Sequence, residues 1–272
     1  MPVRLPGPLW LVGCGNMAGA MLDGWLARGL DSSQVTVIRP SGRPVAEGVR
    51  VLTALPEDEV PALLMLGVKP QMLDAVVPEL VRVAEPGTIL ISILAGVEQE
   101  SLRRRFPSVR TIVRAMPNTP ARLNKAATSL YSDSNEGAAR GIVEQLMEAL
   151  GQVEWIADEG LFDVVSALTA SGPAFVFRFI DALAGAAAAL GLPRAQAQRL
   201  ALATVEGAGA LAAAASESPH QLAEQVASPG GMTRKGLDVL DADQRLERLV
   251  AETVEAAVRR SREMGEEARA RG

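Results

Sequence analysis

A glycine-rich turn near the start of the chain is the first segment whose residue types and spacing suggest chemistry. Residues 13–18 read G-x-G-x-x-A and directly follow the apolar run Leu9–Val12. In this pattern the first glycine permits a tight turn, the second lets the backbone approach a pyrophosphate, and the small Ala18 lets the next helix pack on the strand. The amino end of that helix attracts the anion. The motif predicts a dinucleotide-binding turn around Gly13 and Gly15 rather than a turn without a ligand.

The segment after the second apolar run bears on the choice of dinucleotide. NAD sites usually carry an acidic residue about 20 residues beyond the motif, where it holds the ribose hydroxyls. Here the run Val35–Ile38 is followed by Arg39, Ser41 and Arg43, and residues 39–43 include no carboxylate. Two guanidinium groups and a hydroxyl suit a 2′-phosphate. We therefore predict that NADPH is preferred and NADH is possible; the alternative is that both arginines are solvated loop residues.

The histidine and cysteine counts exclude several other kinds of site. One His excludes a metal site built from several His ligands, and one Cys excludes a disulfide framework and fits a reducing compartment. A Ser-His-Asp or Cys-His device would have to use His220 and Cys14, and nothing in the sequence places them together. We expect Cys14 to fill space in the glycine turn and His220 to lie at the surface or cap a helix.

The elements that must position these residues follow two patterns. The first half alternates apolar runs with helical stretches, which indicates a parallel sheet covered on both faces. From about residue 159 no strand is expected, and alanine-rich segments with Pro193 and Pro219 at helix starts indicate an all-helical region. We predict an α/β fold, with a sheet domain over residues 1–158 and a helical domain over residues 159–272. The expected strands are residues 9–12, 35–38, 63–68, 88–93 and 111–113, and the expected helices include residues 16–28, 71–83 and 245–270.

Composition and charge narrow the partners. The 272 residues are 48% apolar and 22% charged, a balance typical of soluble globular proteins. A net charge of −5 argues against nucleic acid as the main partner, because neutralising phosphates needs a basic face. Asp163, Arg178 and Asp181 interrupt the longest apolar region, residues 161–192, so we expect core helices there and no membrane partner. The N-terminal segment does not resemble a signal peptide, and we expect a cytoplasmic protein.

Five further motifs stand in a fixed order beyond the glycine turn. They are V-K-P, S-I-L-A-G, R-A-M-P-N-T-P, S-G-P-A-F and S-P-G-G-M-T, at residues 68–70, 92–96, 114–120, 171–175 and 228–233. In this order and spacing, over nearly the whole chain, the sequence resembles the pyrroline-5-carboxylate reductase family. The A-M-P-N-T-P and S-P-G-G-x-T strings are the specific ones, because many dehydrogenases share the glycine motif.

The resemblance implies a Rossmann-type parallel sheet domain followed by an all-helical C-terminal dimerisation domain that interleaves with a partner chain. It also implies a homodimer formed through these helices, and several family members assemble further into decamers. The implied reaction is hydride transfer from NAD(P)H to the C=N bond of 1-pyrroline-5-carboxylate, a cyclic imine. The product is L-proline, in the last step of proline biosynthesis.

By matching position, the resemblance also assigns residues to the site. The cofactor would contact the glycine turn and three later segments, with the following residues: Gly13, Gly15, Asn16, Met17, Ala18, Val68, Lys69, Pro70, Ala95, Ala115, Met116, Pro117 and Asn118. The substrate would contact the late glycine loop, contributed by the partner subunit, with the following residues: Ser228, Gly230, Gly231, Met232 and Thr233. Thr233 is the residue to which a catalytic part is assigned.

The residue types of the late loop suit imine reduction. The reaction needs a hydride donor held close to the carbon and a proton on the nitrogen, and it needs no activated nucleophile. Backbone N–H groups at Gly230 and Gly231 suit a substrate carboxylate, and the Thr233 hydroxyl suits a hydrogen bond to the imine nitrogen or the product amine. The alternatives are a flexible turn for the glycines and an ordinary helix cap for Thr233.

Departures from the family pattern leave other readings open. Met232 stands where a small residue or Thr is usual, and Arg234 and Lys235 add charge, which leaves a related cyclic imine open as substrate. A 3-hydroxyacid dehydrogenase of the same two-domain architecture would need Lys where Arg178 stands, and arginine is a poor acid or base. A third alternative is a cofactor-binding protein without turnover, against which the intact loop at residues 228–233 argues.

Overall fold

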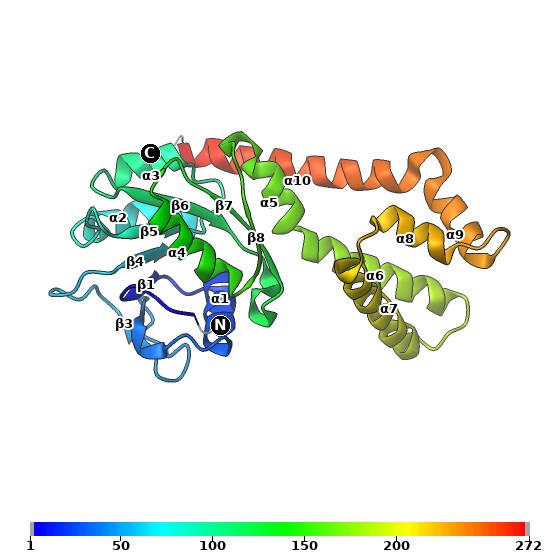
Figure 1. The fold of residues 1–272 in the computed structure, drawn as a ribbon, viewed down its shortest axis with the longest axis horizontal. Helices are drawn as coiled ribbons and strands as arrows, with labels where there is room; N and C mark the ends of the chain where they lie inside the picture. The colour runs from blue at the N-terminus through cyan, green and yellow to red at the C-terminus, as the bar shows by residue number, and fades with distance from the viewer. Residues whose placement is uncertain (1–2, 270–272) are drawn as a thin grey trace. The chain divides into compact units, whose positions relative to one another are not determined.

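The computed structural model describes residues 3–269, and the contacts within it divide them into two units. The first, here called the sheet unit, comprises residues 3–171 and 257–269, and the second, the helical unit, comprises residues 172–256. Figure 1 shows the strands of the sheet unit in blue to green and the helical unit in yellow-green to orange. The last helix, α10 (Arg245–Arg269), begins in the helical unit and ends in the sheet unit. The two units are defined by contacts within the structure, and the domain division predicted from the sequence, residues 1–158 and 159–272, stays a prediction.

The sheet unit is built on one eight-stranded sheet with the strand order β3-β2-β1-β4-β5-β6-β7-β8. Strands β1 to β6 are parallel, β7 is antiparallel to β6, and β8 is parallel to β7. Between β6 and β7 the chain forms the 3-10 turn η3 (Thr119–Leu123), and a connection this short reverses the chain instead of crossing over. The strands are β1 (Leu9–Val12), β2 (Val35–Ile38), β3 (Arg50–Leu52), β4 (Leu63–Leu66), β5 (Ile89–Ser92), β6 (Thr111–Met116), β7 (Ala126–Tyr131) and β8 (Gly151–Trp155).

The predicted parallel sheet is confirmed, and its five expected strands correspond to β1, β2, β4, β5 and β6. The sequence analysis does not predict the other three strands, for physical reasons. Strand β3 has three residues and is partly solvated, and β8 alternates half-buried with exposed residues. Strand β7 is buried but reads A-A-T-S-L-Y, and alanine and serine favour strands only weakly.

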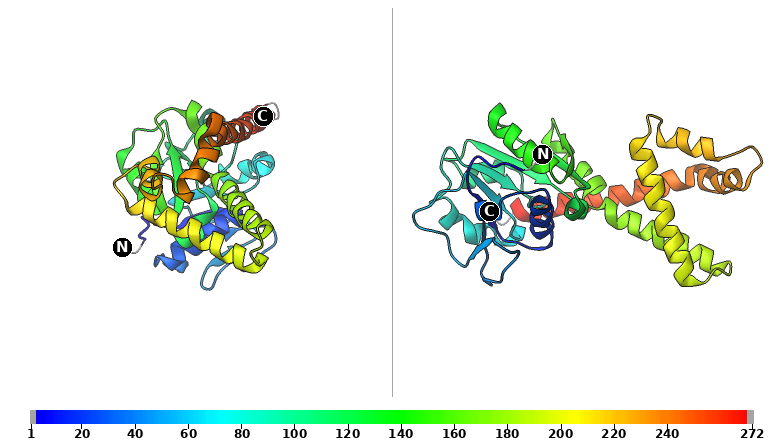
Figure 2. Two further views of the ribbon diagram at one scale, coloured as in Figure 1. Left: turned by 90° about the vertical axis from the view of Figure 1, so that its right-hand side faces the viewer. Right: turned by 60° about the horizontal axis from the view of Figure 1, so that its bottom comes forward.

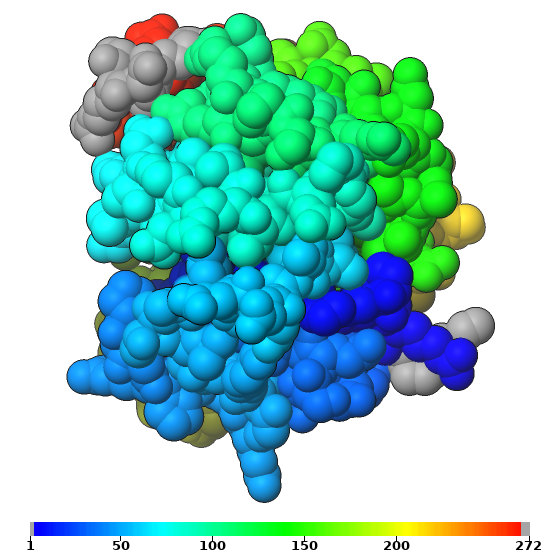
Figure 3. Space-filling model, turned by 90° about the vertical axis from the view of Figure 1, so that its left-hand side faces the viewer, coloured from blue at the N-terminus to red at the C-terminus, as the bar shows by residue number. Residues whose placement is uncertain are grey.

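Both faces of the sheet are buried, and successive residues of a strand enter opposite cores. Leu9 and Leu11 of β1 join a cluster with α1 (Asn16–Ala27) and α4 (Gly137–Glu148). Trp10, between them, joins the cluster under α2 (Leu73–Leu80) and α3 (Gln99–Arg105). The fully buried Trp25 of α1 donates its indole N–H to the Leu146 carbonyl of α4 at 2.7 Å. Figure 3 shows one face of this unit, where the early segments in blue pack beside the middle of the chain in cyan and green.

The helical unit consists of α6 (Gly172–Ala189), α7 (Arg194–Ala214), α8 (Pro219–Val226), α9 (Met232–Asp241) and the first turns of α10. Its buried hydrophobic cluster is made of alanines at the α6–α7 contact, Ala184, Ala197 and Ala201. Figure 2 shows the α6–α7 hairpin from two further sides. Pro193 is the N-cap of α7 and Pro219 is the first residue of α8, so both predicted helix starts are confirmed.

One helical stretch in the described residues, Glu159–Ala189, is long and apolar enough to cross a membrane by length and composition alone. It covers the turn η4 (Glu159–Leu161), α5 (Phe162–Thr169) and α6. Only 11% of its most apolar window is buried within the chain. Most of its apolar side chains are therefore not covered by the described residues.

Candidate functional site

The glycine turn has the geometry that close approach of a dinucleotide requires. Gly13 has φ +83°, and its N–H donates to the Ile38 carbonyl at the end of β2 at 2.8 Å. A Cβ on Gly13 would lie 2.9 Å from both the Gly67 carbonyl and the Val68 side chain. Ala18 is buried, and a Cβ on Gly67 would come within 3.1 Å of its methyl group. The first glycine and the small residue of the motif are thus both required by the packing of β1, β4 and α1.

The amino end of α1 is open above this turn. Gly15 is the N-cap of α1, and among residues 3–269 no side chain caps its N–H groups and no atom lies within 4 Å of a Cβ at Gly15. Asn16 is exposed and Met17 is half-buried at the start of the helix. Uncapped N–H groups at a helix start carry partial positive charge and bind phosphate oxygens. The residues present therefore fit the pyrophosphate of a dinucleotide.

Arg39, Ser41 and Arg43 lie on the turn that follows β2. The Arg39 N–H donates to the Leu52 carbonyl at 2.9 Å, and the Ser41 hydroxyl accepts from the Arg43 N–H at 3.5 Å. Burial raises the pKa of the Cys14 thiol, and the positive charge of Arg39 offsets part of that rise. The positive charge of Arg39 is therefore close enough to the glycine turn to favour a negative charge at Cys14. In the described part of the chain, neither Arg39 nor Arg43 forms an ion pair.

Three further predicted segments lie at the same edge of the sheet, where β4, β5 and β6 end. Val12 is in register with Leu66 and Leu66 with Ser92, so the chain leaves β1, β4 and β5 at one level, and β6 extends two residues beyond Arg114, the partner of Ser92. The segments that follow these strand ends contain the predicted Val68, Lys69, Pro70, Ala95, Pro117 and Asn118. Lys69 and Ala95 are exposed there, whereas Ala115 and Met116 are buried in β6. The structure thus brings the predicted cofactor residues of four strands to one edge.

Asn118 has a structural contact that the sequence does not reveal. Its side-chain amide donates to the Thr169 carbonyl of α5 at 2.9 Å, and its carbonyl oxygen accepts from the Ala127 N–H of β7 at 3.1 Å. Asn118 therefore ties the end of β6 to two neighbouring elements. Its predicted cofactor contact stays a prediction.

Arg114 and Glu159 form a buried ion pair behind this edge. The Arg114 guanidinium donates to Glu159 and lies 4.2 Å above the centre of the Phe162 ring. Glu159 also accepts the Gln99 backbone N–H at 2.7 Å, at the start of α3. Sequence reasoning assigned no part to Arg114, although a charge inside the apolar strand T-I-V-R-A-M signals a buried partner. The pair fixes the end of β6 against α3 and α5.

The late glycine loop lies in the helical unit. Gly230 has φ +71°, the Gly231 N–H donates to the Ser228 carbonyl at 3.0 Å, and Gly231 is the N-cap of α9. In the part of the chain that the structure describes, no side chain caps α9, so the N–H groups of its first turn are available to a carboxylate. Met232 is 92% exposed, and the half-buried Thr233 hydroxyl makes no hydrogen bond to any described residue.

The neighbours of this loop do not occupy it. Arg234 is turned to α8, where it pairs with Glu224, and Lys235 pairs with Asp238 at 3.4 Å on its own helix. The added charges at positions 234 and 235 are thus engaged away from Thr233. Arg178, which stands where the alternative 3-hydroxyacid dehydrogenase would need a Lys, is exposed on α6.

Two family descriptions match the chain. Residues 159–264 match "Pyrroline-5-carboxylate reductase dimerisation" and residues 9–96 match "NADP oxidoreductase coenzyme F420-dependent". The pyrroline-5-carboxylate reductase of Pseudomonas aeruginosa is 34% identical over 263 residues, which cover 94% of this chain and 96% of that protein.

Solved structures show the same similarity. A pyrroline-5-carboxylate reductase from Coxiella burnetii has a TM-score of 0.88 at 31% identity, and the match covers 96% of this chain and 99% of that one. A pyrroline carboxylate reductase from Plasmodium falciparum, solved with NADP bound, has a TM-score of 0.83 at 26% identity and covers 96% and 98%. The similarity therefore extends over both units.

Proposed function

The chain belongs to the pyrroline-5-carboxylate reductase family, and from this premise we infer how its residues carry out the family reaction. It is an oxidoreductase that reduces the C=N bond of 1-pyrroline-5-carboxylate to give L-proline with a nicotinamide cofactor. It thereby serves proline biosynthesis. On the structural side, the open amino end of α1 at Gly15 is the observation that carries the assignment, because it leaves a place for a pyrophosphate.

We propose that the cofactor is bound by the turns at the carboxyl edge of the sheet. Gly13, Gly15 and the first N–H groups of α1 hold the pyrophosphate, while residues 68–70 and Ala95 line the remainder. When bound, the reduced nicotinamide supplies the hydride. The sheet unit's own residues bind and orient, and they transfer no proton. Asn118 keeps this edge rigid through its contacts with Thr169 and Ala127.

NADPH is the preferred cofactor in this proposal. Arg39 lies beside the glycine turn, and neither it nor Arg43 is paired with a carboxylate in the described residues. An unpaired guanidinium binds a 2′-phosphate through strong charge-assisted hydrogen bonds. The NADP-bound relative from Plasmodium falciparum supports the same choice.

The late glycine loop binds the substrate in this proposal. The Gly231 N–H already donates to Ser228, so the N–H groups of Met232 and Thr233, in the first turn of α9, hold the carboxylate of the cyclic imine. The Thr233 hydroxyl hydrogen-bonds the imine nitrogen and stabilises the amine as it forms. A strong acid is not required, because the substrate imine can bind already protonated. The loop of one subunit serves the cofactor edge of its partner.

We propose that the protein is a cytoplasmic homodimer formed through the C-terminal helices, with further assembly into a decamer. The match of residues 159–264 to a dimerisation family supports the dimer. The exposed apolar residues of Glu159–Ala189 are then covered by a second copy and not by lipid. Arg178 and Asp181 within that stretch agree with this choice, since charges are costly in a bilayer.

The direct test is to incubate the purified protein with NADPH and 1-pyrroline-5-carboxylate and to monitor oxidation of the cofactor as a loss of reduced-nicotinamide absorbance. A parallel assay uses NADH. We expect rapid oxidation with L-proline as the product and a higher kcat/KM with NADPH. Binding of NADPH without oxidation would direct attention to a related cyclic imine, since the exposed Met232 stands at the substrate loop. Equal kcat/KM with both cofactors would contradict the proposed role of Arg39 and Arg43.

A further inference from the structure

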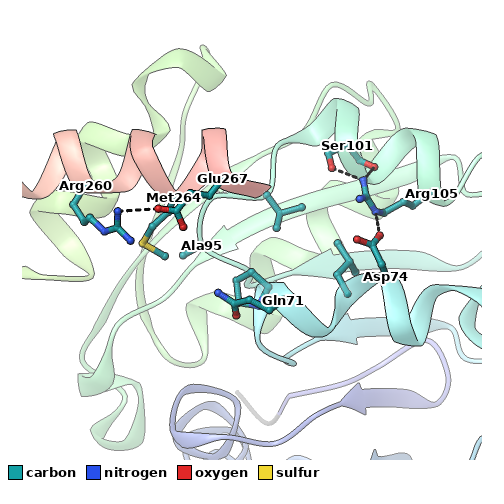
Figure 4. A pocket seen from close by; sticks show the side chains of 11 residues that line it. Gln71, Asp74, Ala95, Ser101, Arg105, Arg260, Met264 and Glu267 are labelled. Atoms are coloured by element: carbon teal, nitrogen blue, oxygen red, sulfur yellow. Dashed lines mark hydrogen bonds and ion pairs between the residues drawn. The ribbon is translucent and has the colours of Figure 1, made fainter. Parts of the chain in front are cut away.

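The last turns of α10 touch the loop between β5 and α3 backbone to backbone. A Cβ placed on Gly96 of that loop would lie 3.2 Å from the Gly265 nitrogen and 3.3 Å from the Met264 carbonyl carbon. Gly96 has φ +72° and Gly265 is buried. Figure 4 shows Met264 of α10 beside Ala95, the residue proposed to line the cofactor. The end of α10 therefore supports the outer side of a cofactor loop.

Two hollows adjoin this contact. One of about 110 Å³ is lined by Ala95, Val97 and Met264 among others. A larger one of about 410 Å³ is lined by Gly96, Gly265 and Arg114 among others. Leu94 and Val97 fix the inner side of the loop in the core, and the backbone contact at Gly96 limits how closely its outer side approaches α10.

Both partners of the contact are anchored. The Ser261 hydroxyl of α10 donates to Asp163 of α5 at 2.6 Å, which holds the helix one turn before Gly265. The loop starts where the Leu94 N–H donates to the Ser92 hydroxyl at 3.4 Å, and it ends where the Gln99 N–H donates to Glu159 at 2.7 Å. A displacement at Gly96 must therefore be taken up by the loop between residues 94 and 98, which includes Ala95.

We propose that Gly96 is a positioning residue, whose close contact with the α10 backbone at Gly265 holds Ala95 at the distance from the sheet edge that NADPH binding requires. The inference rests on the proposed function, in which Ala95 lines the cofactor. A Cβ on Gly96 points at α10 and not at the cofactor edge, so its effect on binding is transmitted through the loop.

Two single-methyl variants test the proposal because the contact is asymmetric. Gly96→Ala places its methyl group 3.2 Å from α10 backbone, whereas Gly265→Ala places one at an ordinary 3.6 Å from the Gly96 oxygen. We expect Gly96→Ala to raise the Kd and KM for NADPH about tenfold, with kcat nearly unchanged. Gly265→Ala should stay within about twofold of wild type. The Kd is measured by quenching of protein fluorescence on titration with NADPH, without substrate.

A third variant separates positioning from backbone strain. Gly191 has φ +102° and no atom within 4 Å of a built Cβ, so Gly191→Ala strains the backbone without making a contact. We expect Gly191→Ala to lower Tm and leave the Kd for NADPH unchanged. If Gly96→Ala lowers Tm as much and also leaves the Kd unchanged, Gly96 is structural only and the proposal fails.

Two further outcomes are informative. If Gly96→Ala does not fold, Gly265→Leu presses a longer side chain on the same loop from the helix side, and an unchanged Kd in that variant overturns the proposal. If the wild type binds NADPH tightly yet reduces no cyclic imine, the proposed reaction fails while the Kd comparison still tests Gly96 and Gly265.

Discussion

The two units of the chain bury apolar surface in opposite ways. In the sheet unit the largest fully buried side chains are Trp10, Trp25 and Phe106. In the helical unit the buried hydrophobic residues are alanines, and Phe177 and Leu190 are 62% and 91% exposed. The sheet unit has a complete core within one chain, whereas the helical unit leaves large apolar side chains exposed. If a second copy covers them, as proposed, the stability of the helical unit depends on protein concentration and that of the sheet unit does not.

The same division separates the two halves of the chemistry. The proposed cofactor residues lie at one edge of a sheet that is buried on both faces. The proposed substrate residues lie on an exposed loop at the start of α9. In the proposal, the sheet unit binds the cofactor and the helical unit supplies the substrate contacts.

The largest effect is expected in the core of the sheet unit. Trp25→Ala removes a fully buried indole and its hydrogen bond to Leu146, and should cost about 3–5 kcal/mol of unfolding free energy. Chemical denaturation measures this loss. Trp25→Phe keeps most of the volume and should cost less. If the loss varied with protein concentration, the sheet unit would not be self-sufficient.

The exposed apolar face of the helical unit should show the opposite behaviour. Phe177→Asp should weaken dimerisation by about 2–3 kcal/mol per subunit, because a phenyl ring is no longer buried in the assembly. Sedimentation at several concentrations measures the dimer Kd. Leu123→Asp is the matched control, since Leu123 is 72% exposed but lies in the sheet unit. Equal weakening by both variants would place the interface elsewhere.

Thr233 tests the substrate half. Thr233→Ala should lower kcat about ten- to hundredfold through loss of one hydrogen bond to a charged group, and leave the Kd for NADPH nearly unchanged. Steady-state kinetics and a cofactor titration measure the two quantities. Thr233→Ser keeps the hydroxyl and should retain most activity. Unchanged turnover in Thr233→Ala would remove Thr233 from the mechanism.

Arg39 and Arg43 test the cofactor half. The double variant Arg39→Ala with Arg43→Ala should weaken NADPH binding about tenfold, which is roughly 1.4 kcal/mol, because the 2′-phosphate loses its partners. Binding of NADH should change little. Titrations of the same preparation with both cofactors give the ratio. An equal loss for both would locate the 2′-phosphate site elsewhere.

The smallest effect concerns pH. A two-point hydrogen bond from Arg103, at 2.6 and 3.2 Å, holds the pKa of Asp133 below its ordinary value. The Asp133 carboxylate therefore contributes stability above its unfolded pKa of about 3.9, and the contribution is lost as the pH falls through the lower folded value. Because its side chain is 43% exposed, the contribution is under about 1 kcal/mol. Asp133→Asn should flatten the acid end of the stability profile; an unchanged profile would show that the pair contributes nothing.

Local patterns allowed the sequence to predict much of the sheet unit. The glycine turn and β1 are readable because Gly13, Gly15 and Ala18 act within one turn of chain. The direction of β7 depends on η3, a short turn without a strong sequence signal. The Arg114–Glu159 pair and the Gly96–Gly265 contact join residues far apart in the chain, and only the folded packing brings them together. The place of Arg39 directly after β2 is also set locally and could be predicted, whereas its contact with the cofactor stays a prediction.

The tryptophan and tyrosine residues are distributed unevenly between the two units. All three tryptophans, Trp10, Trp25 and Trp155, and the single tyrosine, Tyr131, lie in the sheet unit, while residues 172–256 contain neither type. Tryptophan fluorescence and the tryptophan and tyrosine bands of near-ultraviolet dichroism therefore report on the sheet unit, while Phe175, Phe177 and Phe179 of the helical unit contribute only to the phenylalanine bands. Far-ultraviolet dichroism reports helix content in both units. The two spectra, recorded on one unlabelled sample, distinguish loss of the helical assembly from melting of the sheet.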